Sequence, residues 1–429
     1  MSQSKPTRRA QWALATVILL GVLIRVPWLA TDWRVTQDLA LQRSWARASQ
    51  NVGIVALYDG RAQLYPPLTI FIFHLAARME MILPAAWRAD ERALNVLLKL
   101  PALLADVLTA FLLAMTVWTQ PRLAVLVAAV YLFHPGVFYV SVFWGQVDSV
   151  YTALMIVGLV ALEKNKLRAA WLAGATALGI KLQALAFLPV LLPATLTRGN
   201  RRAVFQAVFL FVGVLLLLVA PWWLTGQFGT PLFNSIFLES RTPRVVVSGY
   251  NLWYLILQDQ AHTTSSLLES PLLGLNLRGF GFLEYGAYAS FIALCVWRKR
   301  ASDLTLAAAL TSFGLFLLPT QVHERFLLPV IALLLLAAAQ SAIKATNITR
   351  TRMLVGAFLL VSLTFCFNLI TIAQPNFVAP FNLIAQPTDS SWIFVLKKLA
   401  LSAAALNLIV FGGLTFLFWK GDVATDARI

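Results

Sequence analysis

The sequence is poor in cysteine, histidine and charge, and each shortage narrows the possibilities. Of 429 residues, 2 are cysteine, 4 are histidine and 12% are charged. Cys295 and Cys366 both lie in apolar runs, so we expect buried small side chains rather than a disulfide. The histidines are scattered, which argues against a His-based metal site. The sequence also lacks the GxxxxGK[ST], GxGxxG and HExxH patterns of common soluble enzymes.

Apolar residues make up most of the sequence. They make up 59% of the chain, in unbroken runs near the length needed to cross a bilayer. Such runs indicate membrane helices, because helices satisfy their own backbone polar groups in lipid, and alternation typical of a barrel is missing. The sequence therefore predicts an all-α polytopic membrane protein. A cleaved signal peptide is an alternative for the apolar run at 12–30, but its length favours a first membrane helix.

The net charge of +16 has an uneven distribution. Basic clusters follow or precede apolar runs at residues 5–9, 164–168, 198–202, 298–300 and 344–352. Such clusters mark the cytoplasmic ends of helices, whereas the segments between them balance basic residues with acids. We interpret the excess positive charge as a topology signal and expect no nucleic-acid partner. Both termini are predicted to be cytoplasmic.

This charge pattern predicts one membrane domain over residues 1–429, with about twelve transmembrane helices. A first outer loop is expected at 31–92, where the apolar run at 68–83 forms an interfacial or re-entrant helix. A second long outer loop is expected at 225–276. Two short helices should meet near Lys181 within 169–197. The remaining helices are expected at 12–30, 93–118, 123–141, 149–163, 203–223, 279–297, 304–319, 326–343, 353–373 and 392–419.

The first outer loop carries the most interesting carboxylate. In a helix, Asp38, Gln42 and Trp45 would share one face because of their spacing. A carboxylate beside the membrane can act as a general base toward a sugar hydroxyl. The alternative is a solvated aspartate paired with Arg34 or Arg43.

Two further polar clusters fall in segments predicted on the same side of the membrane. The first, Trp-Gly-Gln-Val-Asp-Ser at 144–149, could bind a sugar, or Asp148 or Ser149 could simply cap the next helix. In the second, Gln-Val-His-Glu-Arg at 321–325, Arg and His could bind a phosphate. The alternative there is a contact of Arg325 with Glu324 or with a lipid headgroup.

Isolated charges in apolar runs need partners. Lys181 could meet a donor phosphate or a carboxylate such as Asp148. Lys99 and Asp106 are seven positions apart, and we interpret them as a structural ion pair on one helix face. Arg25, near the outer end of the first helix, is expected to snorkel toward the interface.

Five of these segments together resemble one family. The segment at 38–45 resembles the D-x-x-x-Q-R-x-W of the endoplasmic-reticulum glucosyltransferases that extend the dolichol-linked oligosaccharide. Residues 64–69 resemble their Y-P-P-L-T segment, and 322–325 resemble their V-H-E-K with arginine for lysine. Residues 144–149 are similar to the W-G-Q-x-D-S of prokaryotic relatives, and 249–253 to a family N-x-W element. The chain thus resembles the GT-C superfamily of polytopic glycosyltransferases.

The resemblance implies an inverting transfer of a hexose from a polyprenyl-phosphate donor to a glycan, glycolipid or other acceptor. The transfer would occur at the extracytoplasmic membrane face, with Asp38 as catalytic base and His323, Arg325 and Lys181 at the donor phosphate. No metal or other cofactor is implied, because the family's glucosyltransferases need none. The residues expected to bind sugar or acceptor are Gln42, Trp45, Tyr65, Gln146, Asp148, Asn251, Trp253 and Glu324.

Other functions stay open at this point. A lipid-linked sugar flippase or another transporter would also be polytopic, but transporters place polar groups near the midplane of broken helices. Here the polar motifs are predicted at one membrane face. Another GT-C transfer, to lipid A or to protein, is also compatible. The prokaryote-like 144–149 segment points to a bacterial inner membrane, while the hexose and the acceptor are not indicated.

Overall fold

The computed structural model describes residues 8–32, 37–58, 65–227, 244–298, 303–344, 347–372 and 390–420. This part of the chain is helical and contains two isolated β-bridges but no strand. It forms two compact units. Unit 1 comprises Met1–Leu185 and Gly199–Arg241, and unit 2 comprises Ala186–Arg198 and Thr242–Ile429. The predicted single domain and its loop bounds stay predictions.

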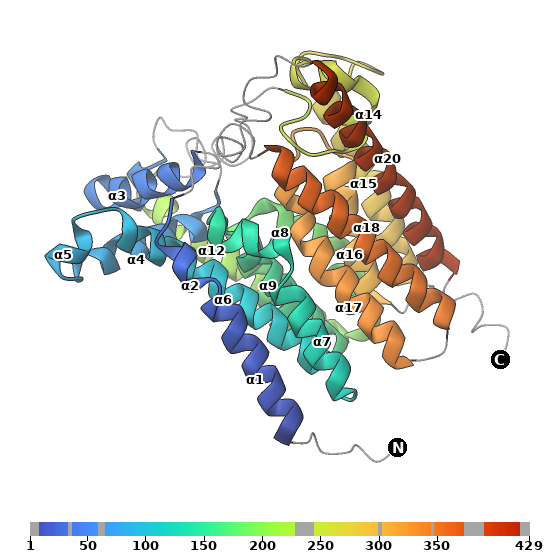
Figure 1. Cartoon of the computed structure of the whole chain (residues 1–429), viewed down its shortest axis with the longest axis horizontal. Helices are drawn as coiled ribbons and strands as arrows, with labels where there is room; N and C mark the ends of the chain where they lie inside the picture. Colours follow the sequence, from blue (N-terminus) through green and yellow to red (C-terminus); the bar gives the residue numbers. More distant parts are fainter. Residues whose placement is uncertain are drawn as a thin grey trace. The chain divides into compact units, whose positions relative to one another are not determined.

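Unit 1 is built around one long helix, α6, which contacts α4, α7 and α9. Figure 1 shows α1, α6 and α7 running side by side, and α3 lies against α4. The elements of this unit are α1 (Arg8–Leu23), α2 (Val26–Leu29), α3 (Asp38–Ala56), α4 (Pro67–Met81), α5 (Ala85–Arg88), α6 (Arg92–Thr116), α7 (Pro121–Leu132), α8 (Pro135–Phe138), the π-helical turn η1 (Tyr139–Phe143), α9 (Asp148–Glu163), α10 (Leu167–Ile180) and α12 (Arg201–Leu224).

Helix α6 shows why unit 1 folds as a membrane bundle. Its buried residues include Asn95, Lys99 and Asp106, whereas Leu104 and Phe111 are exposed. Polar groups therefore face the bundle and apolar groups face outward, which is the arrangement expected for a helix surrounded by lipid. The inward polar face brings charged side chains into the part of the unit that carries the predicted site.

Two helix breaks shape the polar end of unit 1. The chain bends by 50° between α7 and the α8–η1 segment, where the His134 side chain caps α8 and Pro135 begins it. The second break is at Lys181, whose backbone is extended at the end of α10. Thr69 donates a 2.7 Å hydrogen bond to the Ile180 carbonyl there, which satisfies an acceptor that the break leaves exposed. This break confirms the prediction that two short helices meet near Lys181.

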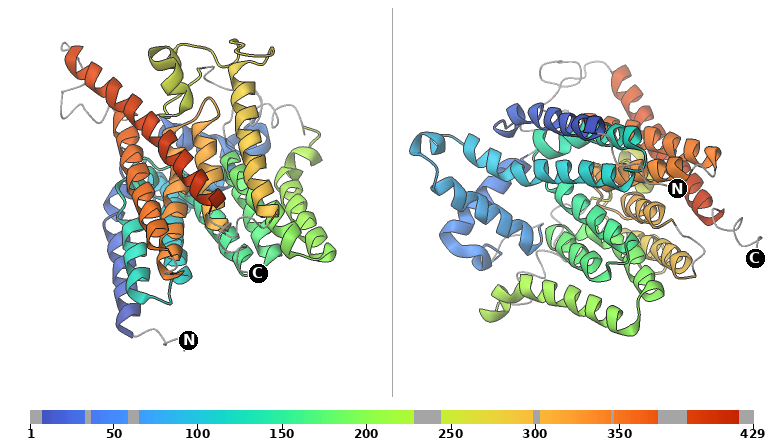
Figure 2. Two further views of the ribbon diagram at one scale, coloured as in Figure 1. Left: turned by 90° about the vertical axis from the view of Figure 1, so that its right-hand side faces the viewer. Right: turned by 90° about the horizontal axis from the view of Figure 1, so that it is seen from below.

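Unit 2 is a helical bundle in which α17 lies between α16 and α18 and is deeply buried. Figure 2 shows α20, in red, running along α18, and α20 also contacts α16. The elements of this unit are α11 (Leu188–Arg198), α14 (Leu252–Leu257), the 3₁₀ turn η4 (Gln258–His262), α15 (Leu277–Trp297), α16 (Leu304–Leu317), the 3₁₀ turn η5 (Glu324–Leu327), α17 (Leu328–Lys344), α18 (Ile348–Ile372) and α20 (Ser390–Lys420). The 3₁₀ segment η2 (Leu182–Phe187) connects the units along the chain.

The chain is a multi-pass membrane protein. Seven helices of the described residues are long and apolar enough to cross a membrane, or up to eight if the bent α7–η1 segment counts as one span. Helices α10 and α16 and the segment Leu182–Arg198 are apolar but shorter. The predicted total of about twelve transmembrane helices stays a prediction. So does the interfacial position of α4, which has 15 residues.

Candidate functional site

The candidate base lies at the start of a helix, which is the condition under which Asp38, Gln42 and Trp45 share a face. Helix α3 begins at Asp38, so its carboxylate occupies the first turn, where the helix dipole favours a negative charge. Gln42 and Trp45 follow on the same face and are buried, while Asp38 is partly exposed. The helix thus anchors one wall of the site and leaves the carboxylate within reach of solvent.

A chain of hydrogen bonds joins Asp38 to two segments far away in sequence. The Tyr65 hydroxyl donates to Gln146 Oε1 at 3.1 Å, and Gln146 Nε2 donates to Asp38 Oδ2 at 2.9 Å. An amide can accept at one end and donate at the other, so fully buried Gln146 fixes the carboxylate relative to the tyrosine. Gln42 adds a third link, because its Nε2 donates to the Gly145 carbonyl at 3.2 Å.

Tyr65 is itself held by buried aromatic rings. Its ring centroid lies 5.7 Å from that of Trp45 and 5.8 Å from that of Phe73, both edge-on. Tyr58 donates its hydroxyl to the Tyr65 carbonyl at 2.9 Å. Burial raises the pKa of Tyr58 well above its ordinary value of 10.0, so the hydroxyl stays a donor. The sequence analysis missed Tyr58, which has no distinguishing motif.

Gly145 is required by its conformation and by its neighbours. Its φ of +80° lies in the left-handed region, which favours glycine. A Cβ at this position would come within 3.1 Å of Cγ and Cε of Lys99 and 3.4 Å of Cδ1 of Leu39. A side chain at this position would therefore be both strained in its backbone and crowded by Lys99 and Leu39.

A buried ion pair stands next to this chain. Lys181 Nζ donates to both carboxylate oxygens of Asp148, at 2.8 and 2.7 Å, and Asp148 is fully buried. Helix α9 has Val147 at its cap position, so capping by Asp148 or Ser149 is wrong. The pairing of Lys181 with a carboxylate such as Asp148 is confirmed. The donor-phosphate role of Lys181 and the sugar-binding role of Asp148 stay predictions.

The ion pair proposed between Lys99 and Asp106 is wrong. Asp106 lies 3.5 Å from Nε of Arg25, whereas Lys99 donates to main-chain carbonyls. Arg25 is fully buried and donates to the carbonyls of Gly21 and Leu132, so it does not snorkel. The seven-residue spacing placed both α6 charges on the inward face correctly, but the breaks in α1–α2 and α7–α8 expose carbonyls that compete for the cations.

Arg43 has partners other than the candidate base. Its NH2 group lies 2.8 Å from Asp32 and 2.9 Å from Glu91, and its NH1 group donates to Asn95. Arg43 thus links the segment before α3 to the start of α6. The other alternative partner, Arg34, lies outside the described residues.

Unit 2 contains the second predicted cluster. NH1 of Arg325 donates to Glu324 Oε1 at 3.3 Å and lies 3.2 Å from Nδ1 of His323. Ser248 donates a short hydrogen bond to the other oxygen of Glu324. Glu324 is fully buried, so the serine and arginine donors offset the cost of burying its charge. The contact between Arg325 and Glu324 is confirmed, and a phosphate-binding role for His323 and Arg325 stays a prediction.

Asn251 and Trp253 bind the end of a helix in the same unit. Asn251 Oδ1 caps α14 by accepting from the Tyr254 backbone, and its Nδ2 donates to the Pro319 carbonyl at 3.0 Å. Trp253 Nε1 donates to the Leu318 carbonyl at 2.6 Å. These contacts give both residues a structural role that the sequence analysis missed, and sugar binding by them stays a prediction.

A second set of unit 2 contacts comes from a span. Asn368 of α18 donates to the Ser248 carbonyl at 2.8 Å and accepts from the Tyr250 backbone. The Tyr250 hydroxyl donates to Thr371 at 2.7 Å, and burial raises the pKa of Tyr250 to about 12. An asparagine within an apolar run was the signal that could have identified Asn368.

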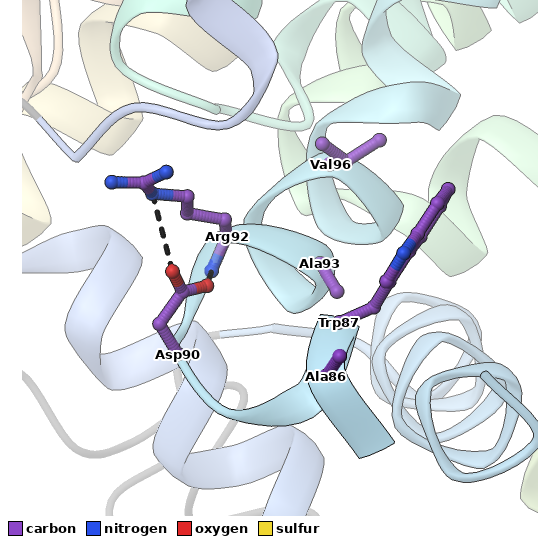
Figure 3. Close-up of a pocket in the computed structure, with 6 residues that line it drawn as sticks. All are labelled: Ala86, Trp87, Asp90, Arg92, Ala93 and Val96. Carbon is purple, nitrogen blue, oxygen red and sulfur yellow. Dashed lines mark hydrogen bonds and ion pairs between the residues drawn. The ribbon is translucent and has the colours of Figure 1, made fainter. Parts of the chain in front are cut away.

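Two surface cavities in unit 1 lie apart from these residues. Figure 3 shows the smaller one, about 280 Å³, with Trp87 on one side and an ion pair between Asp90 and Arg92 on the other. The larger one, about 760 Å³, lies where the first turns of α1 and α7 meet and includes Arg9 and Arg122. Among the described residues, no group of three or more His, Cys, Asp or Glu is placed to hold a metal ion.

The chain is similar to solved structures, though not to curated sequences. No protein-family model matches the chain, and no curated protein sequence matches it. One similar solved structure is ArnT from Cupriavidus metallidurans bound to undecaprenyl phosphate. The two are 16% identical, with a TM-score of 0.45, and the match covers 96% of this chain and 79% of that one.

Proposed function

We propose that this chain is an inverting GT-C glycosyltransferase that moves a hexose from a polyprenyl-phosphate donor to a glycan or glycolipid acceptor. One observation carries the proposal. The hydrogen-bonded chain from Tyr65 through Gln146 to Asp38 joins three segments that resemble GT-C motifs, although Asp38 and Gln146 are 108 positions apart. These side-chain hydrogen bonds bring motifs that are distant in the chain to one place, which supports a shared site.

The reaction uses Asp38 as general base. Its carboxylate takes the proton of an acceptor hydroxyl while that oxygen attacks the anomeric carbon of the donor. The bond between the anomeric carbon and the phosphate oxygen breaks, and the polyprenyl phosphate leaves as a stable anion. Gln146 and Tyr65 hold the carboxylate in position, so less freedom is lost when the acceptor binds.

The cationic groups have different roles in this proposal. Arg325 and His323 contact the donor phosphate, because a guanidinium and an imidazole can donate to its oxygens as negative charge develops. Lys181 is held by Asp148 through two short hydrogen bonds, so its contribution to the phosphate is smaller. Glu324, Gln42 and Trp45 orient the groups around sugar and acceptor. The protein works without a metal cofactor, with its active site on the extracytoplasmic side of a bacterial inner membrane.

A lipid-linked sugar flippase is the second candidate. The observation that favours it is the buried pair of Lys181 and Asp148 at a helix break, since transporters place charged groups at broken helices. Transport changes no covalent bond, so the products separate the two candidates.

The test uses the full chain in liposomes with synthetic polyprenyl-phosphate glucose or mannose and a lipid extract as acceptor. The proposal predicts release of polyprenyl phosphate together with a new glycosidic bond of inverted anomeric configuration. Movement of intact donor between leaflets, with no new bond, would establish the flippase instead.

A further inference from the structure

Lys99 is a fully buried lysine with an unusual set of partners. Its Nζ lies 2.8 Å from the Thr31 carbonyl, 3.0 Å from the Trp28 carbonyl and 3.5 Å from the Phe143 carbonyl. An ammonium has three N–H donors and no acceptor, so three carbonyls match its capacity. Two of these carbonyls belong to or follow the short helix α2, and the third ends η1. The partial negative charge at helix ends favours a cation there.

These carbonyls lie on the two segments that lead to the candidate base and to its partner. Thr31 precedes the stretch that enters α3 at Asp38, and Phe143 lies three positions before Gln146. The side chain of Lys99 also packs against Gly145, where a Cβ would come within 3.1 Å of its Cγ and Cε. Lys99 therefore touches both sides of the Asp38–Gln146 hydrogen bond without touching either residue in that bond.

The other contacts of the 143–146 segment show why a tether is needed. Gln146 donates its backbone N–H to the Val140 carbonyl, and Gln42 donates to the Gly145 carbonyl. Neither hydrogen bond reaches α2, which the segment touches through the Phe143 ring, whose centroid lies 5.4 Å from that of Trp28. Lys99 adds hydrogen bonds from α6 to the ends of both α2 and η1, and α6 is the central helix of unit 1.

We propose that Lys99 is a positioning residue: its ammonium ties the ends of α2 and η1 together so that the Gln146 amide meets the Asp38 carboxylate. The catalytic part of this inference rests on the proposed function. Because Lys99 acts through Gln146, its loss lowers kcat and leaves the KM for the donor nearly unchanged.

The test is a double-mutant cycle for hexose transfer by the full chain. Lys99→Met keeps the side-chain volume and removes the three donors, and it is expected to lower kcat by about tenfold to a hundredfold, as a small misplacement of reacting groups does. In a Gln146→Leu background, the same substitution should lower kcat by less than about twofold. Equal losses in the two backgrounds would overturn the proposal, because a purely structural residue affects both equally.

A matched control is Arg25→Met, which also removes a buried cation that donates to two helix-end carbonyls in unit 1. Its effect on kcat should be the same factor with and without Gln146. Lys99→Gln serves where Lys99→Met folds poorly, because an amide still donates two hydrogen bonds. It should lower kcat by a smaller factor, and this loss should likewise shrink in the Gln146→Leu background; equal losses in the two backgrounds would contradict the tether.

A second measurement does not depend on transfer. In a chain with Cys295→Ala and Cys366→Ala, cysteines at 38 and 146 are joined by a short bis-methanethiosulfonate reagent. Lys99→Met should slow this crosslinking by about tenfold if the two segments separate. An unchanged rate would overturn the positioning role. Wild-type protein that transfers no hexose, together with slowed crosslinking, would reject the proposed function and retain the tether.

Discussion

The two clusters of candidate residues are held in different ways. In unit 1, Asp38, Gln146 and Tyr65 bind one another through side chains, across three distant segments. In unit 2, Glu324 accepts from its chain neighbour Arg325 and from the distant Ser248, while Asn251 binds main-chain groups near helix ends. A side-chain network is costly to arrange and specifies mutual geometry, whereas bonds to helix ends chiefly stabilise the fold. Unit 1 is therefore where we propose the proton transfer, while the unit 2 contacts to helix ends chiefly stabilise the fold.

The largest expected effect comes from substituting Asp38, the proposed general base in the unit 1 network. Asp38→Asn removes the proton acceptor and keeps the size of the side chain, so the rate of hexose transfer should fall by about 10²- to 10⁴-fold. Asp90→Asn is the matched control, since Asp90 is an exposed acid of the same outer segment. Its rate should stay within about twofold of the wild type. Rates are measured on reconstituted protein, and equal losses for both variants would contradict a special role for Asp38.

The next effect concerns stability in unit 1. Asp148→Asn leaves the Lys181 ammonium buried without its carboxylate, which should lower the free energy of unfolding by about 3–5 kcal/mol. The double substitution Asp148→Asn with Lys181→Met should recover part of this loss. The comparison is Asp303→Asn, which breaks the more exposed pair with Arg350 in unit 2 and should cost about 1 kcal/mol or less. Denaturant titration in detergent measures all three, and equal costs at the two sites would show that burial does not distinguish them.

A smaller effect probes the cations of unit 2. Arg325→Gln removes a charge-assisted donor, and kcat/KM for the donor should fall by about tenfold to a hundredfold. Arg325→Lys should lose less, because an ammonium still donates to a phosphate as a point charge. Steady-state kinetics with varied donor concentration provides the readout. If both variants are less stable but keep the wild-type kcat/KM for the donor, Arg325 serves only to pair with Glu324.

The smallest expected effect shows whether Asn251 in unit 2 stabilises the fold or binds the acceptor. Asn251→Ala removes the cap of α14 and should cost about 1 kcal/mol of stability, with little change in the KM for the acceptor. Asn251→Asp keeps an oxygen that caps α14 but loses the donor to the Pro319 carbonyl. Its stability should therefore lie between that of the wild type and that of Asn251→Ala. Thermal unfolding and acceptor titration decide the point. A raised acceptor KM in well-folded Asn251→Asp would assign this residue to the binding site.

Much of the fold followed from short-range patterns in the sequence. The shared face of Asp38, Gln42 and Trp45 was predicted for a helical segment, and the helix break from an isolated Lys181 between two basic ends. Apolar runs predicted the long membrane-spanning helices, because a helix pairs its backbone N–H and C=O groups within its own segment. These features depend on residues near one another in the chain.

The partners of buried charges could not be predicted in this way. Lys99 and Asp106 share a helix face, yet each binds a group brought in by another helix. Which carbonyls a cation binds depends on which helix ends packing brings beside it, although the breaks near Arg25 and His134 each have a local proline signal. The same limit applies to Asn251, whose side-chain amide donates to the Pro319 carbonyl just beyond the end of α16. The spacing of residues along a helix shows which face they share, but it does not show which groups on other helices they will contact.

The central claim is that Asp38 performs the chemistry without being needed to hold the donor. The most direct measurement follows donor binding and hexose transfer on one preparation of Asp38→Asn, with polyprenyl-phosphate hexose in liposomes. The account predicts a donor Kd within about threefold of the wild type and transfer lowered by about 10²-fold or more, because the base contacts the acceptor proton and not the phosphate. Transfer near the wild-type rate, or loss of donor binding in step with transfer, would contradict it.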